Sequence, residues 1–195
     1  MKDSYKLSLI NSIKNSDSKT YANSNKEAYH IFLNSIFSYA KDEIIIFVTN
    51  FTSIDKLLNN DDFNLINEFL NNKKLNIFYF KNFENSNFSK KVKESNNLII
   101  KKITSPIFNK DQMIQEFITW DNHGYRFSPN AKKLIGIVSA NDVDFTKMCN
   151  KLIFSKSWFK SLIFFFLMFT GNKYIKIDFY KWFNIWVNFY NYIIW

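Results

Sequence analysis

The stretch DNHGYRFSPN, residues 121–130, contains residue types that could take part in chemistry. Arg126 is the only arginine among 26 basic residues, and His123 is one of two histidines. A histidine can serve as a general base. The planar guanidinium of an arginine can hold a carboxylate or a phosphate through two parallel contacts. The same stretch also has the composition of a turn, because Asp, Asn and Gly tolerate unusual backbone conformations.

The turn interpretation accounts for His123 and Gly124. Apolar runs on both sides, ITW at 118–120 and YRF at 125–127, predict a β-hairpin with a short connection. We expect Gly124 to supply a positive φ at the end of the loop. His123 then lies at the tip of the hairpin, with no Ser, Cys or carboxylate at a recognisable catalytic spacing.

Arg126 has two interpretations that the sequence leaves open. It forms a structural ion pair with an acidic residue, or it binds the anionic group of a ligand. His30 lies beside the apolar stripe of a helix, which predicts a partly buried structural histidine. Cys149, the only cysteine, excludes an internal disulfide and a multi-cysteine metal site. We expect no metal and no cofactor.

The net charge of +9 is compatible with polyanionic partners, but the lysines are scattered along the chain. The densest clusters are at 90–93 and 101–102. Scattered lysines predict a solvated surface and only weakly support nucleic acid as a partner. The N-terminus has no apolar segment of signal-peptide length, so we expect a cytoplasmic protein.

The apolar pattern alternates between helices and buried strands. The unbroken apolar run at 44–48 predicts a strand buried on both faces, and the runs at 75–80 and 98–103 predict two further strands paired with it in parallel. Four helices are predicted, three with caps at Ser24, Asp61 and Asp142 and a polar one over 86–95. The sequence therefore predicts an α/β fold with a mixed, largely parallel sheet and helices on both faces.

The composition divides the chain into three parts. Residues 1–21 are predicted to form an N-terminal arm, 22–158 the α/β domain, and 159–195 a C-terminal extension. The extension has 15 aromatic residues, but its apolar runs are shorter than the ~20 residues of a membrane-spanning helix. Its Trp and Tyr residues suit a membrane interface. Alternatively, a partner protein or the α/β domain itself covers the aromatic side chains of the extension.

Several short motifs resemble the phospholipase D-like fold. They are a helix with Ala28-Tyr29, the runs IIIFVTNF (44–51) and LNIFYF (75–80), a loop and helix with Asp61, the hairpin around Asp121, and a closing helix from Asn141-Asp142 to Trp158. Active members of this family use a His-x-Lys-x4-Asp motif, in which the histidine attacks phosphorus and the lysine binds phosphate oxygens. Here His30 is followed by Ile31-Phe32 and His123 by Gly124-Tyr125. We therefore assign no catalytic residue.

The resemblance implies a non-catalytic binding or regulatory module for an anionic or nucleotide-like ligand. Ligands of open α/β sheets bind near the carboxyl ends of the strands. Thr49, Asn50 and Arg126 are therefore the predicted ligand-binding residues. The alternatives are a membrane-associated protein anchored by residues 159–195 at the inner face of the membrane, and a phosphodiesterase or nuclease with displaced catalytic residues.

Overall fold

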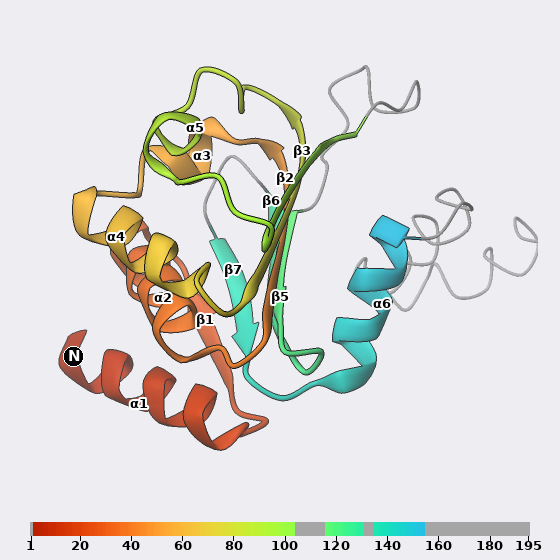
Figure 1. Ribbon diagram of the computed structural model, residues 1–195. Coiled ribbons are helices and arrows are strands. Elements are labelled where there is room, and N and C mark those ends of the chain that lie inside the picture. Colours follow the sequence, from red (N-terminus) through yellow and green to blue (C-terminus); the bar gives the residue numbers. More distant parts are fainter. Residues whose placement is uncertain (1, 104–115, 131–134, 155–195) are drawn as a thin grey trace, which may run out of the picture. The chain divides into compact units, whose positions relative to one another are not determined.

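A computed structural model describes residues 2–103, 116–130 and 135–154 of the chain. Its centre is one seven-stranded sheet with the strand order β1-β7-β6-β5-β2-β3-β4 (Figure 1). The strands are β1 (Thr20–Asn23), β2 (Glu43–Asn50), β3 (Lys74–Lys81), β4 (Leu98–Lys102), β5 (Glu116–Trp120), β6 (Gly124–Asn130) and β7 (Ile135–Ser139). The helices are α1 (Lys2–Asn15), α2 (Lys26–Tyr39), α3 (Thr52–Asp55), α4 (Asn60–Phe69), α5 (Asn87–Lys91) and α6 (Val143–Phe154).

The predicted α/β fold with a mixed sheet is confirmed, but the sheet is less parallel than expected. Only β2, β3 and β4 pair in parallel, in the predicted order. The other four pairings are antiparallel. β5 and β6 form the predicted hairpin, and the connection from β6 to β7 is also too short for the long crossover that parallel neighbours need. β4 is also largely exposed, because it forms the edge of the sheet.

Helices cover both faces of the sheet, as predicted (Figure 1). Consecutive residues of a strand point to opposite faces. Trp120 packs against Phe32 of α2, with ring centroids 5.7 Å apart. Its neighbour Thr119 donates a hydrogen bond to Asn150 of α6 at 2.7 Å. The face beneath α2 holds the main core cluster, to which α1 and α4 also contribute.

Helix caps follow the expected chemistry at slightly different positions. Asn25, not Ser24, caps α2 and accepts from the Ala28 N–H at 2.8 Å. Asn59, not Asp61, caps α4 in a reciprocal capping box. In both places several cap-forming residues follow one another, and the local pattern does not choose between them. The polar helix expected over 86–95 is shorter than predicted, since α5 ends at Lys91, and Ser86 caps its start.

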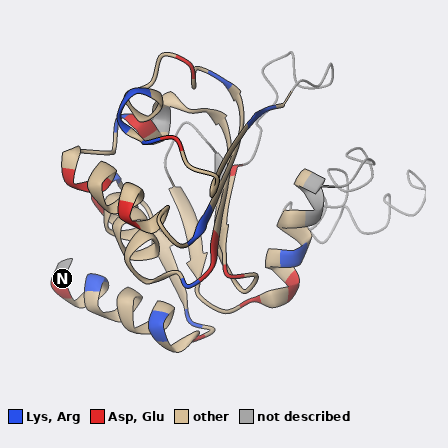
Figure 2. Cartoon of the chain, in the orientation of Figure 1, with Lys and Arg blue, Asp and Glu red and all other residues tan. Residues whose placement is uncertain are grey.

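Charged residues are distributed over the described elements rather than gathered on one face, which agrees with the scattered lysines of the sequence (Figure 2).

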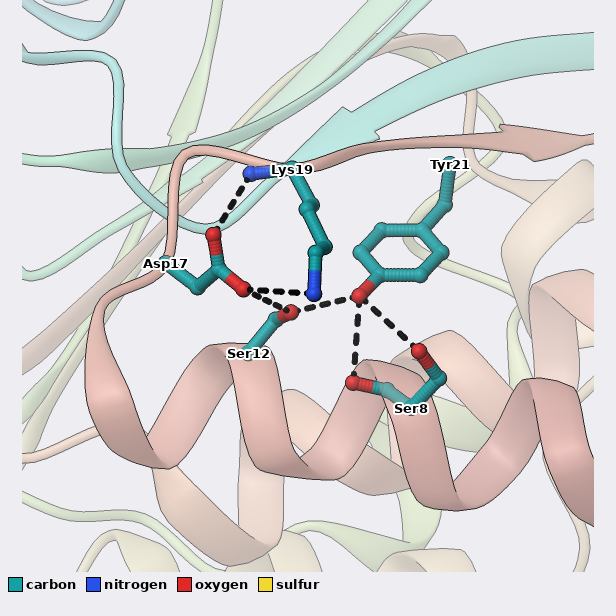
Figure 3. A network of polar contacts seen from close by, with 5 residues as sticks. All are labelled: Ser8, Ser12, Asp17, Lys19 and Tyr21. Carbon is teal, nitrogen blue, oxygen red and sulfur yellow. Dashed lines mark hydrogen bonds and ion pairs between the residues drawn. The ribbon is translucent and has the colours of Figure 1, made fainter.

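The N-terminal residues belong to the folded unit. Leu9 and Ile13 of α1 are buried in the main core, and β1 pairs with β7. The hydroxyl of Tyr21 in β1 contacts the hydroxyls of Ser8 and Ser12 in α1, at 3.1 and 2.5 Å (Figure 3). The expected boundary between an arm and a domain, at residues 21 and 22, therefore falls inside a strand of the sheet.

The hairpin between β5 and β6 confirms the turn interpretation for Asp121 and Asn122 but not for Gly124. Asp121 and Asn122 carry the positive φ values, 51° and 58°. The Asp121 carboxylate also accepts the N–H groups of residues 41–43 at 2.8 to 3.2 Å. Gly124 lies opposite Trp120, and a Cβ there would approach the indole to 2.0 Å. Gly124 does not have a positive φ, so that prediction is wrong. The glycine instead makes room for a cross-strand ring.

The predicted extension, residues 159–195, lies outside the described residues and stays a prediction. Within the described ranges, no helix is both long and apolar enough to cross a bilayer.

We expect Gly124→Ala to lower the free energy of unfolding by about 2 kcal/mol or more, because the added methyl group displaces a buried indole. Urea denaturation measures the change. Asn122→Gly is the matched control in the same turn, since glycine adopts positive φ without cost. A Gly124→Ala variant as stable as this control would contradict the packing explanation.

Candidate anion-binding site

The only arginine lies buried on the face of the sheet beneath α1 and α2. Arg126 in β6 is 1% exposed. Its Nε donates a hydrogen bond to Asn23 Oδ1 in β1 at 3.0 Å. The guanidinium carbon lies 3.9 Å from the centroid of the Tyr29 ring in α2. A lysine could not combine the stacking with this directed bond, because its ammonium is not planar.

Two neighbouring residues shape the space around the guanidinium. Gly136 in β7 lies opposite Asn23, and a Cβ there would be 3.0 Å from the guanidinium carbon of Arg126. The Asn23 amide nitrogen donates to the Tyr5 hydroxyl in α1 at 3.4 Å. This second bond orients the amide so that its oxygen accepts from Arg126. The absence of a side chain at Gly136 leaves the guanidinium room beside β7.

Glu116, the first residue of β5, is the carboxylate partner of this cluster. It is 5% exposed and interacts electrostatically with Arg126. Its Oε1 accepts two hydrogen bonds from Thr49, one from the N–H at 2.9 Å and one from the hydroxyl at 2.7 Å. The backbone of Asn50 also favours the ionised form of this carboxylate. Glu116 is therefore held at the carboxyl end of β2 by Thr49 and interacts with the charge of the buried arginine.

Burial dominates the electrostatics of the cluster. It raises the pKa of the Glu116 carboxyl, against the hydrogen bonds from Thr49 and Asn50 and the charge of Arg126. Burial also lowers the pKa of Arg126, although a guanidinium remains protonated at neutral pH. Burial raises the pKa of Tyr29 to about 12, so its phenol is neutral at pH 7. The counter-charge of Arg126 within this cluster is therefore Glu116 and not Tyr29.

Both histidines have structural partners in other parts of the described chain. His30 Nε2 in α2 lies 2.9 Å from Asp62 Oδ2 in α4, and its side chain is 35% exposed, as predicted for a structural histidine. His123 Nδ1 lies 2.8 Å from the Ala140 carbonyl oxygen. Cys149 is buried, and burial raises the pKa of its thiol, so the thiolate form is disfavoured.

The three residues predicted to bind a ligand are brought together around a residue that the sequence analysis did not select. Thr49 donates two hydrogen bonds to Glu116, and Asn50 and Arg126 lower the pKa of its carboxyl. One signal could have identified this glutamate. It stands five residues before Asp121, which is the spacing between the lysine and the aspartate of His-x-Lys-x4-Asp. In that alignment Glu116 takes the place of the lysine, and Ile114 takes the place of the histidine.

Outside the cluster, lysines follow the carboxyl ends of the other parallel strands. Lys81 ends β3 and is exposed, and its strand partner is Asn50. The Asn50 side-chain oxygen accepts from the Asn82 amide at 3.0 Å. Lys102 ends β4 and pairs with Glu84 at 2.9 Å, with both side chains about half exposed. This edge of the sheet therefore presents cations and amides to solvent beside the buried cluster.

No protein-family model matches the chain, and no curated protein matches it. Among solved structures it is similar to NucT from Helicobacter pylori, with a TM-score of 0.50 and 14% identity over 68% of this chain and 91% of that chain. NucT is a member of the phospholipase D superfamily. The fold of this chain is phospholipase D-like.

A second similar structure is TrmBL2, an archaeal chromatin protein described as showing a novel mode of DNA binding. Its TM-score is 0.46, with 13% identity over 77% of this chain and 56% of that chain. At 14% identity, the similarity to NucT shows the fold alone and carries no residue role to this chain.

We expect Arg126→Ala to lower the free energy of unfolding by about 3–5 kcal/mol, because it leaves the Glu116 carboxylate buried without its counter-charge. Arg126→Lys should recover little of the loss, since lysine cannot stack on Tyr29 and bind Asn23 together. Urea denaturation of the full-length chain measures both changes.

A double-mutant cycle separates the charge interaction from the loss of packing. Arg126→Ala combined with Glu116→Gln should cost clearly less than the sum of the two single changes. Lys102→Ala, which removes a cation from the exposed pair with Glu84, is the control and should change stability little. Additive effects of Arg126→Ala and Glu116→Gln would show that the two charges are not coupled.

Proposed function

We propose that this phospholipase D-like domain is a binding or regulatory module that recognises an anionic or nucleotide-like ligand without hydrolysing it. The observation that carries the proposal is the position of Glu116. Its carboxylate occupies the Thr49 and Asn50 donors at the place where the catalytic motif would supply a lysine.

The chemistry of the family explains why this exchange opposes catalysis. Phosphodiester cleavage needs cations at the phosphate oxygens, whereas a buried carboxylate repels a phosphate. The aligned position of the nucleophilic histidine holds Ile114, which has no nucleophilic atom. His30 and His123 contact Asp62 and Ala140, and neither contacts the cluster around Glu116 within the described chain.

The exposed edge beside the cluster suits an anionic ligand. The carboxyl ends of parallel strands are the usual ligand side of an open α/β sheet. Here that side carries Lys81 and Lys102, with the amides of Asn50 and Asn82 beside them. We propose that phosphate groups bind at these lysines while the inner donors stay occupied by Glu116.

Membrane association is the second candidate function, and the aromatic composition of residues 159–195 supports it. The four lysines of that segment would favour an anionic surface at the inner face of the membrane. Attachment there would be compatible with a ligand-binding domain in the cytoplasm, since the two proposals concern different parts of the chain.

We expect purified full-length protein to show no turnover of bis-p-nitrophenyl phosphate or plasmid DNA, because the aligned motif lacks both histidine and lysine. Product release above a no-protein blank measures this. Activity that disappears in His30→Ala or His123→Ala would instead identify a phosphodiesterase or nuclease with displaced catalytic residues.

We expect nucleotides or inorganic phosphate to raise the thermal midpoint of the wild-type protein, and Lys81→Glu combined with Lys102→Glu to abolish the rise. The reversed charges would repel the phosphate. Lys6→Glu, which reverses the charge of an exposed lysine on α1, is the matched control and should keep the response. A response lost equally in the control would reflect net charge and would contradict a site at the strand ends.

A further inference from the structure

Four groups near the carboxyl end of β2 act together on a single carboxylate. The Thr49 N–H and hydroxyl donate to Glu116 Oε1 at 2.9 and 2.7 Å, and the backbone of Asn50 also favours the ionised form of this carboxylate. Arg126 adds its positive charge. Consecutive backbone N–H groups, a hydroxyl and a guanidinium are the groups with which proteins bind phosphate or carboxylate oxygens.

The ladder of hydrogen bonds between β2 and β5 ends before Thr49, so the N–H group at the end of β2 has no strand carbonyl of β5 to bind. The last pair of that ladder is Phe47 with Phe117. Beyond it, the Thr49 N–H donates to the side chain of Glu116 in place of a strand carbonyl. A buried donor left without an acceptor costs about 1–3 kcal/mol. The donors would therefore favour another anion if Glu116 were absent.

We propose that Thr49, Asn50 and Arg126 form an oxyanion-binding site that the chain closes with its own Glu116 carboxylate. This inference rests on the proposed function, because it concerns the inner part of the same ligand side. A free acetate or phosphate enters the site only when Glu116 moves away or is replaced. Glu116 thus acts as an internal substitute for a ligand and keeps anions out of the buried cluster.

The size of the site limits its ligand class. Glu116 and Arg126 are 5% and 1% exposed, so the space released by removing the glutamate side chain is that of a small carboxylate. Acetate matches the carboxylate group, and inorganic phosphate matches the terminal group of a phosphate ester. The bulk of a nucleotide would remain outside, near the exposed lysines at the ends of β3 and β4.

The test is chemical rescue of Glu116→Ala by added anions. We expect acetate to raise the thermal midpoint of this variant by about 3–6 °C more than that of wild type, at a tenfold excess over its Kd. Sodium chloride at equal ionic strength should not produce the extra rise. If Glu116→Ala does not fold in chloride, the yield of refolded protein in acetate against chloride gives the same answer.

Three further variants assign the effect to the site. Thr49→Val in the Glu116→Ala background removes one donor and should reduce the extra rise. Glu116→Gln keeps the side-chain volume, so it should be less stable than wild type and unresponsive to acetate. Glu84→Ala removes an exposed carboxylate beside Lys102 and should respond as wild type does.

The inference is overturned if acetate stabilises Glu116→Ala no more than wild type, or if Thr49→Val leaves the extra rise intact. Failure of the proposed function gives a different result. In that case wild type shows no response to nucleotides or phosphate at its lysines, while the Thr49-dependent rescue of Glu116→Ala persists. If acetate does not rescue Glu116→Ala but wild type still responds to nucleotides or phosphate, the inference of a closed inner site is wrong and the proposed function stands.

Discussion

The burial of one guanidinium is the constraint on which the antiparallel half of the sheet depends. An unpaired charge in a protein interior costs several kcal/mol, so Arg126 requires partners. Among the described residues, Asn23 of β1, Tyr29 of α2 and Glu116 of β5 interact with it. Each of these residues can stabilise the guanidinium only when the helix or strand that carries it is folded against the sheet. This requirement couples the N-terminal strand and helices to the β5–β6 hairpin, and it explains why the N-terminal residues belong to the folded unit.

The candidate site lies where the pairing of strands changes from parallel to antiparallel. β2 pairs in parallel with β3 on one side and antiparallel with β5 on the other. Because β5 begins at Glu116, the last residues of β2 extend beyond the ladder and their N–H groups face a side chain. Ligand sites of open sheets form at such changes in strand order, since neighbouring elements diverge there. The same geometry brings the internal carboxylate of Glu116 within reach of the Thr49 donors.

The sequence predicts the features that depend on local patterns. Apolar runs identify β2, β3 and β4, and cap-forming residues place the starts of α2 and α4 to within a few positions. Features that depend on distant partners are missed. Asn23 and Arg126 are 103 residues apart, and neither pattern nor composition connects them. The composition of the turn predicts a positive φ at Gly124, because the local sequence does not show that the Trp120 ring lies opposite this residue. Thr49 and Asn50 follow from their position at a strand end and Arg126 from its rarity, whereas Glu116 resembles any other acid until its burial is known.

The pairing of Glu116 with Arg126 also limits how a catalytic site could arise in this fold. A lysine at position 116 would restore the cation of the aligned motif, but it would place two buried positive charges close together. Like charges in a medium of low dielectric constant repel strongly, and Arg126 would lose its counter-charge in the same step. The carboxylate at position 116 and the guanidinium at position 126 therefore support each other. A change of function at one of these positions requires a change at the other, which makes the closed site a property of the pair rather than of either residue.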